Sequence, residues 1–332
     1  MNPKSNGNRR RATGRSRIAA AAAISAIATG ALASVGIAGA ATSVTPPNAS
    51  GNFAFQTIND SHDPTFNQLL GINDFGVIAG YYGSGDKGHP NRGYVIAKGY
   101  AQSQFHNENY PHAAQTQVIG INSRGETVGF YVDAHGANHG FVKLGGRFQT
   151  VDFPTNDNAK PKVDQLLGVN DRGIAVGFYT DSKGQNHGFL ENTANRHFSV
   201  VKVAGDNNVT ASGINNLGDV AGFATNSAGN TEGFLRRAGG RVFHLNFPGA
   251  SMTQAFGVNN GDEVVGTYTD GTGSSATTHG FIWSPGFGFA TVDAPNGIGS
   301  TTLNGINDRG TVVGFYTDSS GNTDGLLAKS NQ

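Results

Sequence analysis

Apolar residues along this chain alternate with glycine and with short polar turns, and one such arrangement recurs six times. In Gly168–Phe178, which reads G-V-N-D-R-G-I-A-V-G-F, two apolar stretches flank the polar turn 170–173. Asn suits the start of this turn because its side chain binds the backbone two residues further on, and Gly suits the end because it accepts a positive φ. The pattern predicts a hairpin of two short strands. The other copies are Gly71–Tyr81, Gly120–Phe130, Gly213–Phe223, Gly257–Thr267 and Gly305–Phe315.

The spacing of the copies limits the architecture. The leading glycines (71, 120, 168, 213, 257 and 305) lie 44 to 49 residues apart, a period typical of propellers, solenoids and arrays. Each unit has room for four short strands. In the third unit the first three are predicted at Gln165–Asn170, Ile174–Asp181 and His187–Leu190. The fourth is expected to resemble Arg147–Pro154 of the unit before, where Pro ends the strand because it cannot donate a ladder hydrogen bond.

The two ends of the repeat region complement each other. The sixth unit supplies three strands, at Leu303–Asn307, Thr311–Thr317 and Gly325–Lys329, and no fourth strand follows them. An additional strand, Phe53–Asn59, precedes the first unit and is similar to the fourth strands elsewhere. We therefore expect an all-β fold: a six-bladed β-propeller with four-stranded blades, spanning residues 53–329 and closed by the N-terminal strand. The alternative is an open β-solenoid.

The first 41 residues have the order of a secretory signal. Residues 1–17 are polar and basic, 18–41 form a long Ala/Gly/Ile run, and Ala38-Gly39-Ala40 has the spacing of a signal peptidase site. We expect residues 1–41 to be removed on export and 42–52 to form a short linker, which predicts an extracellular protein without stable membrane insertion. The alternative is an uncleaved N-terminal membrane anchor, because the run is long enough to span a bilayer.

Composition removes several classes of function. The chain has no Cys, 50 Gly among 332 residues and only 14% charged residues, which suits a Gly-rich all-β protein whose stability comes from packing and ladder hydrogen bonds. Six of the 23 basic residues lie in the first 17 positions, so the remainder of the chain is acidic and is not expected to bind nucleic acid. Phosphate-loop, zinc-protease and serine-hydrolase motifs are missing, and the sequence predicts no cofactor and no metal.

The unit resembles the HAF family of extracellular bacterial repeats, whose pattern runs G-I-N-x-x-G-x-V-V-G followed by H-A-F. Residues 305–314 match the first part closely. The second part is present as His139-Gly140-Phe141, His187-Gly188-Phe189 and His279-Gly280-Phe281, with Gly in place of Ala. The resemblance implies an exported repeat protein of about 47 residues per unit. It brings no established activity and no catalytic residue.

Repetition separates structural residues from functional candidates, because a turn is needed in every unit and a catalytic group only once. The six turn asparagines are therefore predicted turn formers, and the acids after each second strand are expected to cap turns rather than bind Ca²⁺. The three histidines at the third strand are expected to bond the Asp-containing turn beside them, since histidines on separate blades do not converge on a metal. These sets are Asn73, Asn122, Asn170, Asn215, Asn259 and Asn307; Asp133, Asp181, Asp270 and Asp318; and His139, His187 and His279.

A polar residue stands three positions before each leading glycine. In a propeller these six side chains would circle one end of the central channel, where amides and hydroxyls can hold a polar ligand such as a sugar. Asp164 precedes one of them and is the only acid at its position. The predicted ligand-binding residues are Gln68, Gln117, Gln165, Thr210, Gln254, Thr302 and Asp164.

Three functions remain open on the sequence. The favoured one is a secreted binding or scaffold module for carbohydrate or for a surface protein, with one axial site or several equivalent ones. The second is a propeller-type lyase or glycoside hydrolase with a site at the channel mouth near Asp164, Gln165 and Gln254. The third is a structural protein of the envelope or matrix. The sparse charge near the axis favours a binding protein over an enzyme.

Overall fold

The computed structural model describes residues 46–160 and 162–331. The predicted signal segment, 1–41, and the first part of the predicted linker, 42–45, lie outside the described residues. Within the two described ranges, no helix is long and apolar enough to cross a membrane. The helices among these residues are short 3₁₀ turns, at Ser50–Asn52, Gln102–Gln104 and Gly273–Ser275.

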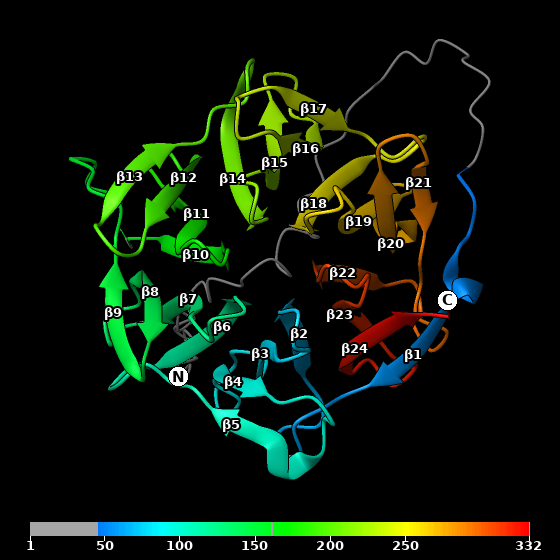
Figure 1. Cartoon of the computed structure of the whole chain (residues 1–332), viewed down its shortest axis with the longest axis horizontal. Coiled ribbons are helices and arrows are strands. Elements are labelled where there is room, and N and C mark those ends of the chain that lie inside the picture. The colour runs from blue at the N-terminus through cyan, green and yellow to red at the C-terminus, as the bar shows by residue number, and fades with distance from the viewer. Residues whose placement is uncertain (1–45, 161, 332) are drawn as a thin grey trace, which may run out of the picture. The chain divides into compact units, whose positions relative to one another are not determined.

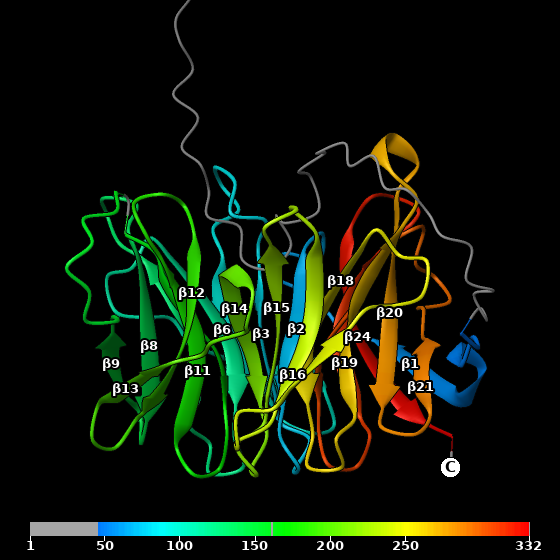
Figure 2. The ribbon, with the colours of Figure 1, turned by 90° about the horizontal axis from the view of Figure 1, so that it is seen from above.

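The described residues form six antiparallel sheets of four strands each, arranged around a central axis (Figure 1). Seen edge-on, the strands run between the two faces of the ring (Figure 2). The predicted all-β fold, a six-bladed β-propeller with four-stranded blades, is confirmed. The β-solenoid alternative is ruled out because the last sheet pairs with the first strand of the ring.

Each blade runs from an inner strand to an outer one. The first three blades are β2 (Asn67–Ile72), β3 (Ile78–Tyr82), β4 (Arg92–Ile96) and β5 (Phe105–Asn107); β6 (Gln115–Ile121), β7 (Thr127–Val132), β8 (Asn138–Leu144) and β9 (Arg147–Val151); β10 (Asp164–Val169), β11 (Ile174–Thr180), β12 (Asn186–Asn192) and β13 (His197–Val200). The last three are β14 (Asp206–Ile214), β15 (Val220–Asn226), β16 (Thr231–Arg236) and β17 (Val242–Leu245); β18 (Met252–Val258), β19 (Val264–Asp270), β20 (Thr277–Ser284) and β21 (Gly288–Thr291); β22 (Thr301–Ile306), β23 (Val312–Thr317), β24 (Thr323–Ser330) and β1 (Phe53–Thr57).

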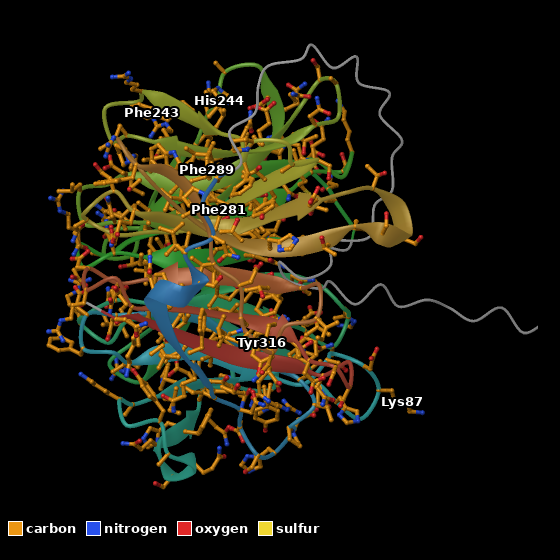
Figure 3. The ribbon with its side chains drawn as sticks, turned by 90° about the vertical axis from the view of Figure 1, so that its right-hand side faces the viewer. Lys87, Phe243, His244, Phe281, Phe289 and Tyr316 are labelled. Atoms are coloured by element: carbon orange, nitrogen blue, oxygen red, sulfur yellow. The ribbon has the colours of Figure 1, made fainter. Side chains whose placement is uncertain are left out.

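The N-terminal strand closes the ring as expected. β1 pairs antiparallel with β24, from Phe53 opposite Ser330 to Thr57 opposite Leu326. The Tyr316 hydroxyl, on the β23 strand of the same blade, lies 2.7 Å from Thr57 Oγ1 (Figure 3 labels Tyr316). The outermost strand of the sixth blade therefore comes from the opposite end of the chain.

The apolar core lies between neighbouring blades. Alternation along each strand turns one face toward the preceding blade and the other toward the next. Val176 of the third blade, for example, packs with Val209 and Phe234 of the fourth. Aromatic pairs such as Phe281 and Phe289 fill the fifth blade edge to face, with ring centroids 5.3 Å apart (Figure 3).

The leading glycine of each unit lets the inner strands approach one another. In all six blades the register of the first hairpin shifts immediately before this glycine, which marks a β-bulge. A Cβ atom on Gly213 would lie 2.4 Å from the carbonyl oxygen of Phe256 on the next inner strand. The recurring glycine is therefore explained by packing around the axis and not by ligand binding.

Candidate functional site

The six turn asparagines do more than form turns. Asn170 Oδ1 accepts hydrogen bonds from the backbone N–H groups of Arg172 and Ile174, each at 3.0 Å, and the predicted turn-forming role is confirmed in every blade. Each amide nitrogen also donates to the backbone oxygen of the equivalent asparagine in the next blade, at 2.9 to 3.1 Å. The last of these bonds, from Asn307 to Asn73, closes a continuous ring around the axis.

A small axial cavity of about 60 Å³ lies at this asparagine ring. Since one water molecule occupies about 30 Å³ in the liquid, the space suits water and not a sugar. The residues that follow the asparagines are also hydrogen-bonded to one another. Asp171 N, for example, donates to Asn216 Oδ1 at 2.8 Å. We therefore regard this end of the axis as a structural element that ties the blades together.

The predicted ring of amides and hydroxyls lies at the other ends of the inner strands. The six side chains are only 1% to 6% exposed. Those with bonds to a neighbour reach across or within blades: Gln117 Nε2 donates to Asn91 Oδ1 at 2.7 Å, and Thr210 Oγ1 accepts from Asn186 Nδ2 at 3.1 Å. The Tyr81 hydroxyl donates to Gln68 Oε1 at 2.7 Å. Gln165, Gln254 and Thr302 are buried in the same way, and the ligand-binding role of this ring stays a prediction.

The three histidines stay on separate blades. Each stacks on the tyrosine opposite it on the second strand, with ring centroids 4.9 to 5.2 Å apart. Each histidine also binds one carboxylate: His187 binds Asp181 (2.9 Å), His139 binds Asp152 (2.9 Å) and His279 binds Asp293 (2.8 Å). The expected bond to the neighbouring turn is confirmed for His187, while His139 lies 3.6 Å from Asp133 of its turn. The expected bond is wrong for His279, which binds Asp293 instead. The loop after β19 contains an inserted 3₁₀ turn, and in it Asp270 Oδ1 accepts from Gly271 N.

One place on the ring departs from the repeat: the connection of residues 152–163 between the second and third blades. It is the longest of the six connections from an outer strand to the next inner strand. Together with β10 and β11 it encloses a pocket of about 230 Å³. The pocket is lined by Thr155, Asp157, Asn158, Ala159, Lys160, Lys162, Asp164, Tyr179 and Thr180.

Asp164 begins β10 and forms part of the pocket wall. Its Oδ1 atom accepts a hydrogen bond from Phe153 N at 2.8 Å, and its Oδ2 atom lies 3.7 Å from Lys162 Nζ. The same ammonium group lies 3.1 Å from Asp152 Oδ2, which in turn binds His139. A chain of charges thus runs from the second blade to the pocket.

The equivalent residues of other blades show what this position requires. The residue four positions before the leading glycine accepts a hydrogen bond from a backbone N–H in the connection from the previous blade. A neutral oxygen makes this bond in four blades: Thr116 from Tyr110 (3.0 Å), Thr253 from Phe247 (2.9 Å), Thr301 from Ala294 (3.1 Å) and Asn67 from Asp60 (2.8 Å). The fold therefore does not need a carboxylate at position 164.

Burial sets the electrostatics of this site. Asp164 is 1% exposed, and desolvation raises its pKa to about 6 even though the Phe153 N–H and Lys162 favour its charged form. Burial also acts to raise the pKa of Asp152, but hydrogen bonds from His139 and Lys162 outweigh it and hold that pKa below its ordinary value. The bond to Asp152 raises the pKa of His139 against the opposing effect of burial. The Asp164 carboxyl group is thus poised to titrate near neutrality, whereas the Asp152 carboxyl group stays ionised.

Sequence reasoning identified Asp164 but missed its neighbours in the 152–163 connection. Asp157, Lys160 and Lys162 belong to no repeated pattern, so no register placed them. The available signal was the cluster of four charged residues at 157, 160, 162 and 164 in a chain with only 14% charged residues. Among the residues described, no group of three His, Asp or Glu side chains can hold a metal ion.

The chain is a β-propeller module by its fold, and comparisons with known proteins agree at that level. TolB from Acinetobacter baumannii is 13% identical with a TM-score of 0.50, covering 78% of this chain and 65% of its own. A mutant of AofleA from Arthrobotrys oligospora is 11% identical with a TM-score of 0.50, covering 85% and 90%. A streptogramin B lyase is 11% identical with a TM-score of 0.49, covering 85% and 100%. No protein-family model matches the sequence, and no curated protein does.

We expect Asp164→Asn to stabilise the protein at neutral pH and not at pH 4. The substitution keeps an acceptor for Phe153 N–H and removes the buried charge. Because the folded-state pKa is raised from 3.8 to about 6, the folded protein holds the proton more tightly than the unfolded chain, and wild-type stability falls as pH rises through this range. A pKa shift of this size corresponds to a free energy of unfolding about 3 kcal/mol higher for the variant than for wild type above pH 7.

Urea unfolding at five pH values from 4 to 8 measures this difference. Thr253→Ser is the matched control, because it keeps the same hydrogen bond in the fifth blade and carries no titratable group. Its difference from wild type should not change with pH. Parallel stability curves for wild type and Asp164→Asn would show that Asp164 is not buried as a carboxylate.

Proposed function

We propose that this chain is an exported binding module that holds a polar ligand of the carbohydrate class in the pocket beside Asp164. The observation that carries the proposal is the buried carboxylate of Asp164, placed on the pocket wall where four other blades use a neutral oxygen. Such a charge lowers stability without serving the fold, and residues of this kind are concentrated at functional sites. The signal-like N-terminus and the HAF resemblance support export.

The lining of the pocket fits a sugar better than an apolar ligand. Carboxylates at 157 and 164, ammonium groups at 160 and 162, and hydroxyl or amide groups at 155, 158 and 180 offer both donors and acceptors. Tyr179 adds an aromatic side chain that Phe153 and His187 hold by stacking at 4.6 and 4.9 Å between ring centroids. At about 230 Å³ the pocket is smaller than most drug-sized sites, so one sugar residue or the end of a glycan is the expected occupant.

A second candidate function is acid–base catalysis on such a ligand. It is favoured by the pKa of about 6 for Asp164, which lets this carboxyl group give or accept a proton near neutral pH. Asp157 lines the same pocket, so two carboxyl groups face one space, as in glycoside hydrolysis. Of the three residues that the sequence assigned to an enzymatic site, Asp164 alone lines this pocket; Gln165 and Gln254 do not.

A glycan array followed by titration calorimetry tests the binding function. We expect the purified protein to retain a subset of glycans, and Asp164→Thr, Asp157→Asn and Lys162→Ala each to weaken binding at least tenfold. Asp164→Thr is the sharpest of these variants because it installs the residue that the second, fifth and sixth blades use. Thr253→Ser should bind as the wild type does.

Two results would contradict the proposal. Failure to retain any glycan would exclude the carbohydrate class, and equal binding by wild type and Asp164→Thr would place the site elsewhere on the ring. Incubation of each bound glycan with the protein separates the two candidate functions. New reducing ends or unsaturated sugars that form with wild type and not with Asp164→Asn would establish catalysis.

A further inference from the structure

Two glutamates are buried at the interface between the second and third blades, near enough that the charge of Glu126 acts on Glu191. Glu126, just before β7, lies two residues before Val128, and Glu191, on β12, lies two residues after Phe189. Val128 and Phe189 pack in the same apolar cluster between these blades, and side chains two apart on a strand share a face. Both glutamates are fully buried, at 0% exposure.

The other five interfaces show that this pairing is not required by the fold. Two positions are compared at each interface. One is the fourth residue after the turn asparagine, and the other, in the following blade, is the fourth residue after the one that corresponds to His187. They hold Val77 with Lys143, Ile174 with Arg236, Asp219 with Trp283, Glu263 with Ala328, and Thr311 with Ile96. Two acids face each other in the second-to-third interface alone among these six.

Two arginines partly compensate the pair from the rim of the interface. Arg124 Nη2 lies 2.9 Å from Glu126 Oε2, which also accepts from Asn122 Nδ2 at 3.0 Å. Arg196 Nε lies 3.0 Å from Glu191 Oε1, and Arg196 Nη2 donates to the carbonyl of Thr150 on the second blade at 3.0 Å. Both guanidinium side chains are 40% to 50% exposed, so water screens them.

The compensation is incomplete. Glu126 Oε1 and both carboxylate oxygens of Glu191 are buried without an aligned hydrogen bond among the described residues, although Arg196 lies close. The charged groups that face Glu191 are Glu126 and Arg196, and those that face Glu126 are Arg124 and Glu191. A like charge nearby disfavours the ionised form of a buried carboxyl group, so the charge of Glu126 adds to the effect of burial on Glu191.

We propose that the interface between the second and third blades is a proton-dependent contact: a proton on the buried Glu191 carboxyl group, near Glu126, keeps these blades packed, and its loss loosens the interface and the ligand pocket at its other end. The role for the pocket rests on the proposed function. The two sites are linked by β10, since Asp164 begins this strand and Gly173 ends the turn that follows it. A Cβ atom on Gly173 would lie 2.8 Å from Arg124 Nη2, so the Glu126 side of the interface touches the same hairpin.

The direction of the effect follows from the environment of Glu191. Desolvation raises the pKa of Glu191 to about 7, with Arg196 lowering it and the charge of Glu126 raising it. The folded-state pKa lies above the ordinary value of 4.5, so the contact is strongest below pH 4.5 and weakens as pH rises toward 7. Above pH 7 the carboxylate is ionised in both the closed and the open interface, and the pH dependence ends.

Hydrogen–deuterium exchange of the full chain tests the proposal without any ligand. After correction for intrinsic exchange rates, we expect peptides that cover residues 120–130 and 186–196 to open about tenfold more for each pH unit between 5 and 7. Residues 152–164 should lose protection in parallel in the Asp164→Asn variant, which removes the pH dependence that Asp164 itself gives to this segment. Peptides 261–268 and 323–330, at the interface of Glu263 and Ala328, serve as the internal control.

Glu191→Gln and Glu126→Gln each leave one acid without its like-charged partner. Glu191→Gln should remove this pH dependence, Glu126→Gln should shift it to lower pH because the like charge no longer adds to the effect of burial, and Glu263→Gln should leave it unchanged. The proposal is overturned if both glutamine variants keep the wild-type pH dependence, or if the control interface shows the same dependence. A loosened interface with unchanged protection at 152–164 would overturn its link to the pocket. A failed glycan screen has no bearing on this readout, so the two proposals fail separately.

Discussion

Deletion of residues 53–59 is expected to unfold the ring and not merely to shorten one blade. β1 is the outermost strand of the sixth blade, so its loss leaves β24 as an unpaired edge from Leu326 to Ser330. Phe53 and Phe55 pack on the cluster of Leu326 and Ala328, and Ile58 is buried at 4% exposure against the first blade. The truncated chain thus loses contacts on both sides of the closure.

The expected loss is comparable to the whole stability of a typical domain. Each apolar side chain removed from the core costs about 1.5 to 3 kcal/mol, and the lost ladder hydrogen bonds add about 1 kcal/mol each. The three side chains alone give about 5 to 9 kcal/mol, and the ladder bonds bring the sum to about 10 kcal/mol or more, within the range of total stabilities of native proteins. We therefore expect either no cooperative unfolding or a melting temperature lowered by more than about 10 °C.

Calorimetric melting of the deletion variant measures this effect. Gln56→Ala is the control, because this side chain lies exposed on the same strand and its loss leaves the pairing intact. The control should melt within a degree or two of wild type. A deletion variant that melts with wild type would mean that β1 does not close the ring.

Replacement of one ring asparagine has the second large effect. Asn170→Ala removes the two bonds that Asn170 Oδ1 accepts from Arg172 N and Ile174 N, and the bond that its Nδ2 donates to Asn215 O at 2.9 Å. All three partners are backbone groups near the axis, where unpaired polar atoms are costly. We expect a loss of about 3 to 5 kcal/mol in the free energy of unfolding.

Asn226→Ala isolates the contribution of the ring. Asn226 Oδ1 caps an outer turn with the same geometry, accepting from Ala228 N at 3.0 Å and Asn230 N at 3.1 Å. Its Nδ2 donates to Glu232 Oε1 of the same blade at 3.2 Å and not to the next blade. Because this turn is exposed to solvent, the loss should be about 1 to 2 kcal/mol. Equal losses for the two variants in urea unfolding would mean that the inter-blade ring adds nothing beyond the turn caps.

The sequence was sufficient for the fold because the fold repeats. Six copies of one hairpin pattern set the number of blades, and the unmatched strand at Phe53 predicted how the ring closes. The turn asparagines were also recognisable, since an Asn-to-Gly turn is a local property of four residues. In each case the needed information lies within a few neighbouring positions.

The same locality explains what sequence reasoning missed. It found the turn bonds of Asn170, but the bond to Asn215 depends on how two blades stack. It selected Gln165 and its five equivalents for a polar channel; these side chains are buried, and their ligand-binding role stays a prediction. The 152–163 connection is longer than its five counterparts, so nothing in the repeat indicated that it would enclose a pocket.

By itself, then, the sequence determined an all-β ring of six four-stranded blades, its closing strand and its turns, because these features follow from short-range patterns and their repetition. Only the tertiary structure decided which side chains are buried and which meet across blades: Asp164 is buried at a pocket, Asn170 binds Asn215 of the next blade, and Glu126 and Glu191 are buried at one interface. The physical reason is that burial and charge pairing depend on distances between residues far apart in the chain. The departures from the repeat, and not the repeat itself, are therefore where the structure places the candidate chemistry.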